Sequence, residues 1–174
     1  DVPEAAERLL LDLPHALPRE VELGADLFQG EAVVDADAEE QLHHIALTLD
    51  LLHLHHHGED LKLWPVLIER APAESEMVRE VADQHEAVDA SIGRIRELLS
   101  AWRDKPDATT RDALADSLEN LTVVLSAHLD DEERLVVPLA AVTMTQDEWN
   151  AIGEHARSSI PQEQIFLVFG MLLE

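Results

Sequence analysis

One short pattern occurs twice in this chain, and it strongly limits the folds that the chain can adopt. The pattern is H-x-x-x-E-x5-P, and its first copy consists of His55, Glu59 and Pro65. The second copy lies 73 residues later, with His128 and Glu132 followed by a proline at the matching place. A histidine and a glutamate four residues apart lie on one face of an α-helix. The repeat therefore predicts two helices that each present an imidazole and a carboxylate on one face.

The apolar residues around the repeat also recur at helical spacing. Steps of three and four residues dominate and strand signals are scarce, so the predicted fold class is all-α. The expected helices cover residues 1–13, 17–29, 37–70 with a kink near Pro65, 75–103 capped by Ser75, 108–140 with a bend near Pro138, 146–157 and 162–173. Because short loops join antiparallel neighbours, we expect an up-down-up-down four-helix bundle over 1–143. Residues 144–174 are expected to form a helical extension packed on the same domain.

Two of the expected helices carry polar residues where a bundle should be apolar. The inward-facing seams consist of Val78, Val81, His85, Val88, Ile92, Ile95, Leu99 and Trp102 in one helix, and of Leu114, Leu118, Leu121, Leu125, His128, Glu132, Leu135 and Leu139 in the other. His85, His128 and Glu132 thus occupy positions at which a bundle helix normally carries leucine. A buried carboxylate is costly unless a partner compensates it. The two seams therefore predict a polar site in the middle of the bundle.

Composition restricts the chemistry of that site. The 174 residues include 37 Asp and Glu against 12 Lys and Arg, for a net charge of -25, which argues against nucleic acid and anionic membranes as partners. The chain has no cysteine and no tyrosine, which excludes disulfides, thiolate zinc sites, iron–sulfur clusters and a tyrosyl radical. Any metal must be held by histidine and carboxylate. No apolar run approaches the ~20 residues of a membrane span, and we expect a cytoplasmic protein.

The spacing within the repeat suits a pair of metal ions. A histidine and a glutamate at i and i+4 can bind one ion together, or the glutamate can bridge to a second ion. Imidazole with carboxylate, without sulfur, favours non-haem iron or manganese over zinc. Ferritin-like bundles use Glu-x-x-His at i, i+3 instead, so the order and the step here differ from theirs.

These residues resemble the hemerythrin-like (HHE cation-binding) family, whose helices present a single His, then H-x-x-x-E, then a His, then H-x-x-x-E/D. The resemblance covers about residues 10–140, and the tail resembles the C-terminal extension of actinobacterial members. It implies two iron ions, as an oxo- or hydroxo-bridged di-iron centre, inside a four-helix bundle. The implied metal ligands are His15, His55, Glu59, His85, His128 and Glu132. Asp89, one turn after His85, is a possible further ligand that could add an oxygen. The reversible oxygen carriers of the family have a second histidine at this place.

The remaining histidines near the repeat are expected outside the site. His53, His56 and His57 fall on other faces of the helix, and His155 is expected at the surface. An alternative register pairs His56 with Asp60 in place of the first copy of the repeat. The common offset of the two copies favours the register given above.

The resemblance implies a non-haem di-iron protein that binds or reacts with dioxygen, peroxide or nitric oxide. Peroxide breakdown by a catalase-like oxidoreductase, and sensing of oxygen or nitric oxide, are the roles that follow. With aspartate at position 89 the histidine-rich environment of the oxygen carriers is lost, so peroxide or oxygen chemistry is favoured over reversible carriage. Two alternatives stay open: a structural or partner-binding bundle whose polar seam is a hydrogen-bonded network, and a zinc- or manganese-binding regulator.

Overall fold

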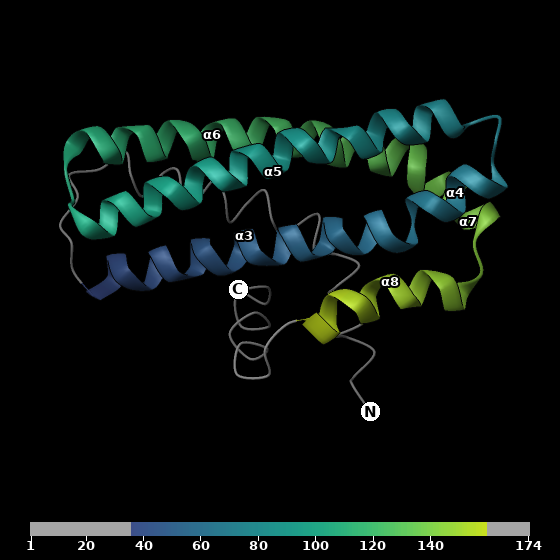
Figure 1. The fold of residues 1–174 in the computed structure, drawn as a ribbon, viewed down its shortest axis with the longest axis horizontal. Coiled ribbons are helices and arrows are strands. Elements are labelled where there is room, and N and C mark those ends of the chain that lie inside the picture. Colours follow the sequence, from purple (N-terminus) through teal and green to yellow (C-terminus); the bar gives the residue numbers. More distant parts are fainter. Residues whose placement is uncertain (1–35, 160–174) are drawn as a thin grey trace.

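The computed structural model describes residues 36–159. Most of these residues form antiparallel helices joined by short turns (Figure 1). In chain order these elements are α3 (Ala36–Lys62), α4 (Trp64–Arg70), α5 (Ser75–Asp104), α6 (Ala108–Asp131), the π-helix η1 (Glu132–Val136), α7 (Val137–Thr143) and α8 (Gln146–Ser159). Every element in this range is helical, so the predicted all-α class is confirmed. The helices expected over 1–13, 17–29 and 162–173, and with them His15, lie outside the described residues.

The first proline of the repeat marks a break between two helices. Helix α3 ends at Lys62, and α4 begins at Trp64 with Pro65 in its first turn. Proline has no N–H to donate to the carbonyl group four residues back, which disfavours an uninterrupted helix. The predicted kink near this residue is therefore confirmed.

The N-terminal ends of α5 and α6 differ in how they are capped. The Asp107 carboxylate accepts a hydrogen bond of 2.9 Å from the backbone N–H of Thr110, which is a regular N-cap for α6. The prediction that Ser75 caps α5 is wrong, because Glu74 occupies that position without a side-chain bond. Ser75 is instead the first helical residue, and its hydroxyl donates to the carbonyl oxygen of Pro72.

The second copy of the repeat leads into a π-helical turn. The backbone N–H of Val137 donates to the carbonyl oxygen of Glu132, five residues back. The wider turn changes the register of the buried stripe. Val136 and Ala140 are buried, whereas Leu135 and Leu139, which the sequence pattern predicted in the seam, are only partly buried. After the π turn, which lies just before Pro138, Val136 and Ala140 are therefore the residues that face the interior of the bundle.

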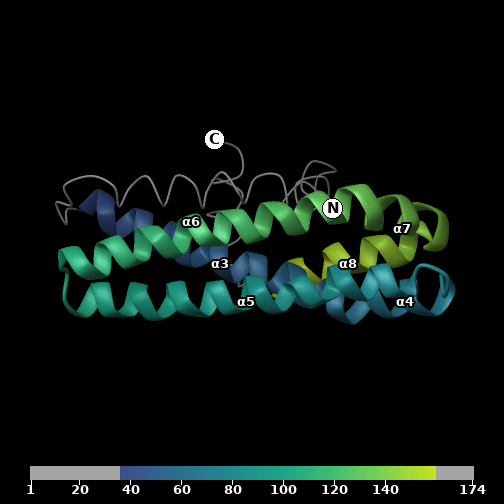
Figure 2. The same ribbon diagram turned by 90° about the horizontal axis from the view of Figure 1, so that it is seen from above.

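The helices pack in a layered bundle (Figure 2). Helices α5 and α6 lie side by side along most of their length, and α3 runs beside them. Helix α8 folds back along α3. The two helices are close at Gly58 of α3, where an added Cβ would make an ordinary contact of 3.6 Å with the carbonyl oxygen of Ile152 in α8. None of the described helices is long and apolar enough to cross a membrane.

Two apolar clusters fill the described part of the interior. The larger cluster consists of Leu42, Ile45, Leu49, Leu51, Leu52, Val88, Ile92, Ile95, Leu98, Leu99, Trp102, Leu114, Ala115, Leu118, Leu121, Leu125 and Leu129. The smaller cluster consists of Leu63, Trp64, Leu67, Val78, Val81, Val136, Ala140 and Ile152. Along α5, His85 comes between the part of the helix in the smaller cluster and the part in the larger one. The buried histidines and glutamates (His56, Glu59, His85, His128 and Glu132) therefore form a polar layer between the two clusters.

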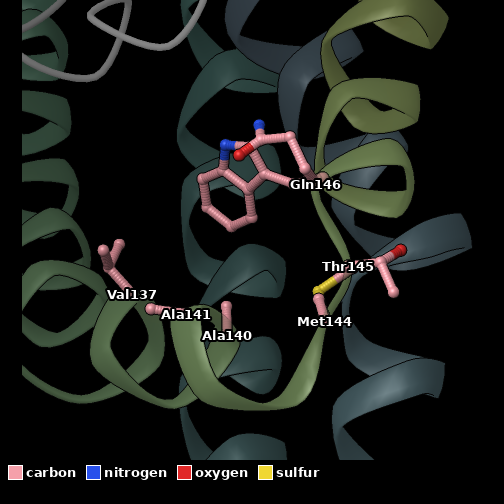
Figure 3. Close-up of a pocket in the computed structure, with 7 residues that line it drawn as sticks. Val137, Ala140, Ala141, Met144, Thr145 and Gln146 are labelled. Carbon is pink, nitrogen blue, oxygen red and sulfur yellow. The ribbon is translucent and has the colours of Figure 1, made fainter.

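A hollow of about 370 Å³ lies between α7 and the start of α8 (Figure 3). It is lined by Val137, Ala140, Ala141, Met144, Thr145, Gln146 and Trp149. None of these residues belongs to the buried polar layer, so the hollow is separate from the site described next.

Candidate metal centre

Five of the predicted ligands meet in the polar layer. His55 and Glu59 come from α3, His85 from α5 and His128 from the last turn of α6, while Glu132 is the first residue of the π turn. All of them are buried except His55, whose side chain keeps a small exposed fraction. The helical spacing of the repeat therefore brings both of its copies to one place.

Glu59 lies at the centre of these contacts. Its Oε1 is 3.2 Å from Nε2 of His55, and its Oε2 is 3.5 Å from Nε2 of His85. In the second copy, Oε2 of Glu132 is 3.7 Å from Nε2 of His128. These distances bring the groups together, yet Glu59 Oε2 and the Nε2 atoms of all three histidines have no hydrogen-bond partner. Buried polar atoms in native proteins are nearly always satisfied, so the donors converge in the way that a bound cation requires.

The buried donors form two groups that share one residue. His56, Glu59, His85 and His128 offer ligand atoms that all lie within 4.8 Å of one another. His55, Glu59 and Glu132 do the same as a second group. Glu59 belongs to both groups, and its two oxygens face different histidines. Each of the two groups could hold a metal ion.

His56 corrects the sequence-based expectation. It was predicted on a face of α3 outside the site, but its side chain is only 1 % exposed and belongs to the first donor group. Its ring stacks on His85 with centroids 4.1 Å apart, and it meets the ring of His128 edge-on at 5.0 Å. The sequence signal that could have indicated this is the adjacent pair His55-His56. Successive residues of a helix point about 100° apart, so the two rings can reach different donors of one site.

Hydrogen bonds on the outer side of the site orient two of the imidazoles. Nδ1 of His85 lies 2.9 Å from Oδ1 of Asp60, and Nδ1 of His128 lies 3.2 Å from Oε1 of Gln84. A carboxylate and an amide oxygen can only accept, so both histidines donate through Nδ1 and direct the Nε2 lone pair inward. The Gln84 amide is held in turn, because its Nε2 donates to Asp131 at 2.9 Å.

These orienting residues were not predicted from the sequence in that role. The alternative register pairs Asp60 with His56, whereas the structure pairs it with His85. For Gln84, the available signal was its position next to His85, on the side of α5 that faces α6.

The structure also places Asp89 and His155, of which Asp89 was predicted as a possible ligand and His155 at the surface. Asp89, the possible additional ligand, is about half exposed and its Oδ1 lies 3.2 Å from Nδ1 of His53, which is also half exposed. Asp89 is not a member of either donor group. His155 is partly buried rather than a free surface residue, and its ring lies 5.8 Å from that of His57.

Burial shifts the protonation equilibria of the site towards uncharged groups. It raises the pKa of Glu59 to about 8, opposed in part by the hydrogen bond with Glu132. The pKa of Glu132 is likewise raised, by burial and then by the charge of Glu59. Burial, followed by the neighbouring His85, lowers the pKa of His55 to about 4 and that of His128 to about 3. His55 and His128 are therefore neutral at pH 7, as metal ligation requires, and a cation would favour ionisation of the carboxylates.

Comparison with known proteins agrees with this geometry. Residues 5–140 match the model of the hemerythrin HHE cation-binding domain, which covers most of the chain and both copies of the repeat. Comparisons with curated proteins and with solved structures gave no match. A helical bundle with a buried histidine and glutamate cluster is what a cation-binding domain of this type requires. The chain belongs to the hemerythrin HHE cation-binding domain family.

Proposed function

We propose that this protein holds two iron ions in the polar layer of the bundle and uses them in reactions with peroxide or dioxygen. The observation that carries the proposal is the position of Glu59 in both donor groups. A single ion would need only one of these groups. Two groups with a common carboxylate suit two ions a few ångströms apart, as in two-metal sites generally.

The chemistry of the donors favours iron. In the described part of the chain the site offers imidazole nitrogens and carboxylate oxygens, and the chain contains no cysteine. Such a set suits non-haem iron or manganese, whereas soft thiolate ligands would favour other metals. Glu59 and Glu132 would supply two negative charges in a buried place, which offsets part of the cost of burying the cations.

Peroxide or dioxygen is the proposed reaction partner because the hemerythrin-like family, whose model this chain matches, suggests these small molecules for a di-iron site. Bound iron would supply reversible electron transfer to such molecules. The polypeptide contributes the surroundings: two apolar clusters on either side keep bulk water away, and Asp60 and Gln84 fix the orientation of His85 and His128. The proposed net reaction with peroxide is the catalase-type conversion of two molecules of hydrogen peroxide to dioxygen and two of water.

Metal stoichiometry tests the proposal most directly. The metal-free protein would be loaded anaerobically with ferrous iron, desalted and assayed for iron and protein. We expect close to two irons per chain for the wild type. Glu59→Ala should lose both ions because it removes the shared ligand, whereas Glu132→Ala, which affects only one donor group, should retain about one. Glu80→Ala changes an exposed glutamate on α5 and serves as the control, so this variant should retain both ions.

Absence of iron from the loaded wild type would refute the proposal. Equal binding by Glu59→Ala and Glu80→Ala would refute the shared-ligand arrangement. A preference for zinc or manganese when the metals compete would identify a metal-binding protein of another kind.

Peroxide turnover is tested separately with an oxygen electrode. Iron-loaded wild type should release dioxygen from hydrogen peroxide, and His128→Ala should abolish the release. His53→Ala is the matched control, because this histidine is exposed and lies outside both donor groups. If the loaded wild type releases no dioxygen while it binds iron, the ion pair serves binding or sensing rather than peroxide breakdown.

A further inference from the structure

His56 is the most deeply buried residue of the polar layer whose role the repeat does not explain. Its side chain is 1 % exposed, and neither Nδ1 nor Nε2 has a hydrogen-bond partner. By contrast, Nδ1 is hydrogen-bonded in both His85 and His128. An imidazole with both nitrogens buried and unpaired is unfavourable compared with an apolar side chain of similar size. Packing alone therefore gives no reason for a histidine at this position.

The surroundings of His56 suggest what the ring nitrogens do. Its ring is stacked on His85 and meets His128 edge-on, so three imidazoles gather beside Glu59. Ligand atoms of all four residues lie within 4.8 Å of one another. Imidazole binds metals through a ring nitrogen, and both ring nitrogens of His56 are buried without a hydrogen-bond partner.

Helix geometry explains why two adjacent histidines serve one site. His55 and His56 are successive residues of α3 and point about 100° apart around its axis. His55 joins the donor group that contains Glu132, and His56 joins the group that contains His85 and His128. We propose that His56 is a metal ligand, so that α3 gives one imidazole to each of two ions and places Glu59 between them. The inference rests on the proposed metal pair and assigns it a ligand outside the repeated H-x-x-x-E pattern.

The test compares His56→Leu with His43→Leu, which changes an exposed histidine on the same helix. Each metal-free protein would be titrated with Co²⁺ and followed by its visible absorption, in competition with a chelator of known affinity. The wild type and His43→Leu should bind two ions. In His56→Leu one of the two should bind at least ~10- to 100-fold more weakly, since even indirect partners of metal ligands contribute that much. The visible bands of the weakened ion should also change in energy and intensity.

The outcomes distinguish this inference from the proposed function. If the wild type binds two ions and His56→Leu binds both with unchanged affinity and unchanged spectrum, the assignment of His56 is refuted while the metal pair stands. If the wild type binds no metal, both are refuted. The metal-free His56→Leu protein should unfold in urea at a concentration at least as high as the wild type, which separates loss of a ligand from loss of the fold.

A second variant applies if His56→Leu fails to fold. His56→Ala would be titrated with Co²⁺ alone, with added imidazole, and with added N-methylpyrrole, a ring of similar shape without a basic nitrogen. Restoration of the second ion by imidazole but not by N-methylpyrrole supports ligation. Equal restoration by both rings, or none by imidazole, overturns it.

Discussion

Replacing Glu59 by glutamine should stabilise the metal-free protein while it weakens metal binding. Burial raises the pKa of this carboxyl from an ordinary value of 4.5 to about 8. The folded state therefore binds the proton more tightly than the unfolded state does. The contribution to stability is complete below pH 4.5 and is lost progressively as the pH rises towards 8. Glutamine has a similar shape and no proton to lose, so the variant escapes this loss.

The magnitude follows from the two pKa values. Each pH unit between the unfolded and the folded pKa costs the wild type about 1.4 kcal/mol. Relative to Glu59→Gln, the wild type should therefore lose about 1 kcal/mol by pH 5 and about 3 kcal/mol by pH 7.

Urea unfolding in the presence of a chelator measures this difference. The free energies of unfolding of wild type and Glu59→Gln would be compared at pH 5, 6 and 7, with Glu80→Gln as the exposed control. The free energy of unfolding of Glu59→Gln should exceed that of the wild type by an amount that grows with pH. The corresponding difference for Glu80→Gln should stay near zero. A difference that does not change with pH, or a glutamine variant less stable than the wild type at pH 7, would show that this carboxyl is not buried in its protonated form.

Three further predictions concern the same part of the molecule. Metal binding at pH 7 should release about one proton more from the wild type than from Glu59→Gln, measured by calorimetry in buffers with different ionisation enthalpies. Gln84→Leu should weaken metal binding ~10- to 100-fold, because it removes the oxygen that accepts from Nδ1 of His128. ¹⁵N NMR of the metal-free variant should show loss of the Nδ1–H tautomer of His128. An unchanged tautomer would contradict the orienting role of Gln84. Gly58→Ala should raise the free energy of unfolding by about 0.5–1 kcal/mol, because its Cβ meets Ile152 at ordinary contact distance, whereas Gly58→Leu should lower it by about 1–3 kcal/mol.

The sequence predicted most of the described helices because helical periodicity and proline are local signals. The break at Pro65 and the seam residues His85, His128 and Glu132 follow from spacing alone, and all of these residues lie where the pattern predicts. The π turn was not predictable in this way. It depends on one residue inserted in the turn rather than on composition, and it moved the buried positions from Leu135 to Val136.

The site was harder to predict than the fold because its residues are brought together by packing between helices. A repeat identifies residues that occur in both copies, and His56 has no counterpart in the second copy. Whether the ring of His56 points inward depends on how α3 is rotated against α5, which no spacing within α3 determines. Asp89 was considered for the converse reason: its spacing from His85 suits ligation, but its side chain lies on the exposed side of α5 beside His53.

The position of the polar layer between the two apolar clusters affects how cooperatively the protein unfolds. Without a cation, the layer contains carboxyl and imidazole groups with unpaired atoms, so it couples the two clusters only weakly. Bound ions would link α3, α5 and α6 through ligand bonds at this level. Amides of the smaller cluster should therefore exchange with solvent by local opening in the metal-free protein, and only by global unfolding once metal is bound. Metal binding would then make the two apolar clusters unfold together as one cooperative unit.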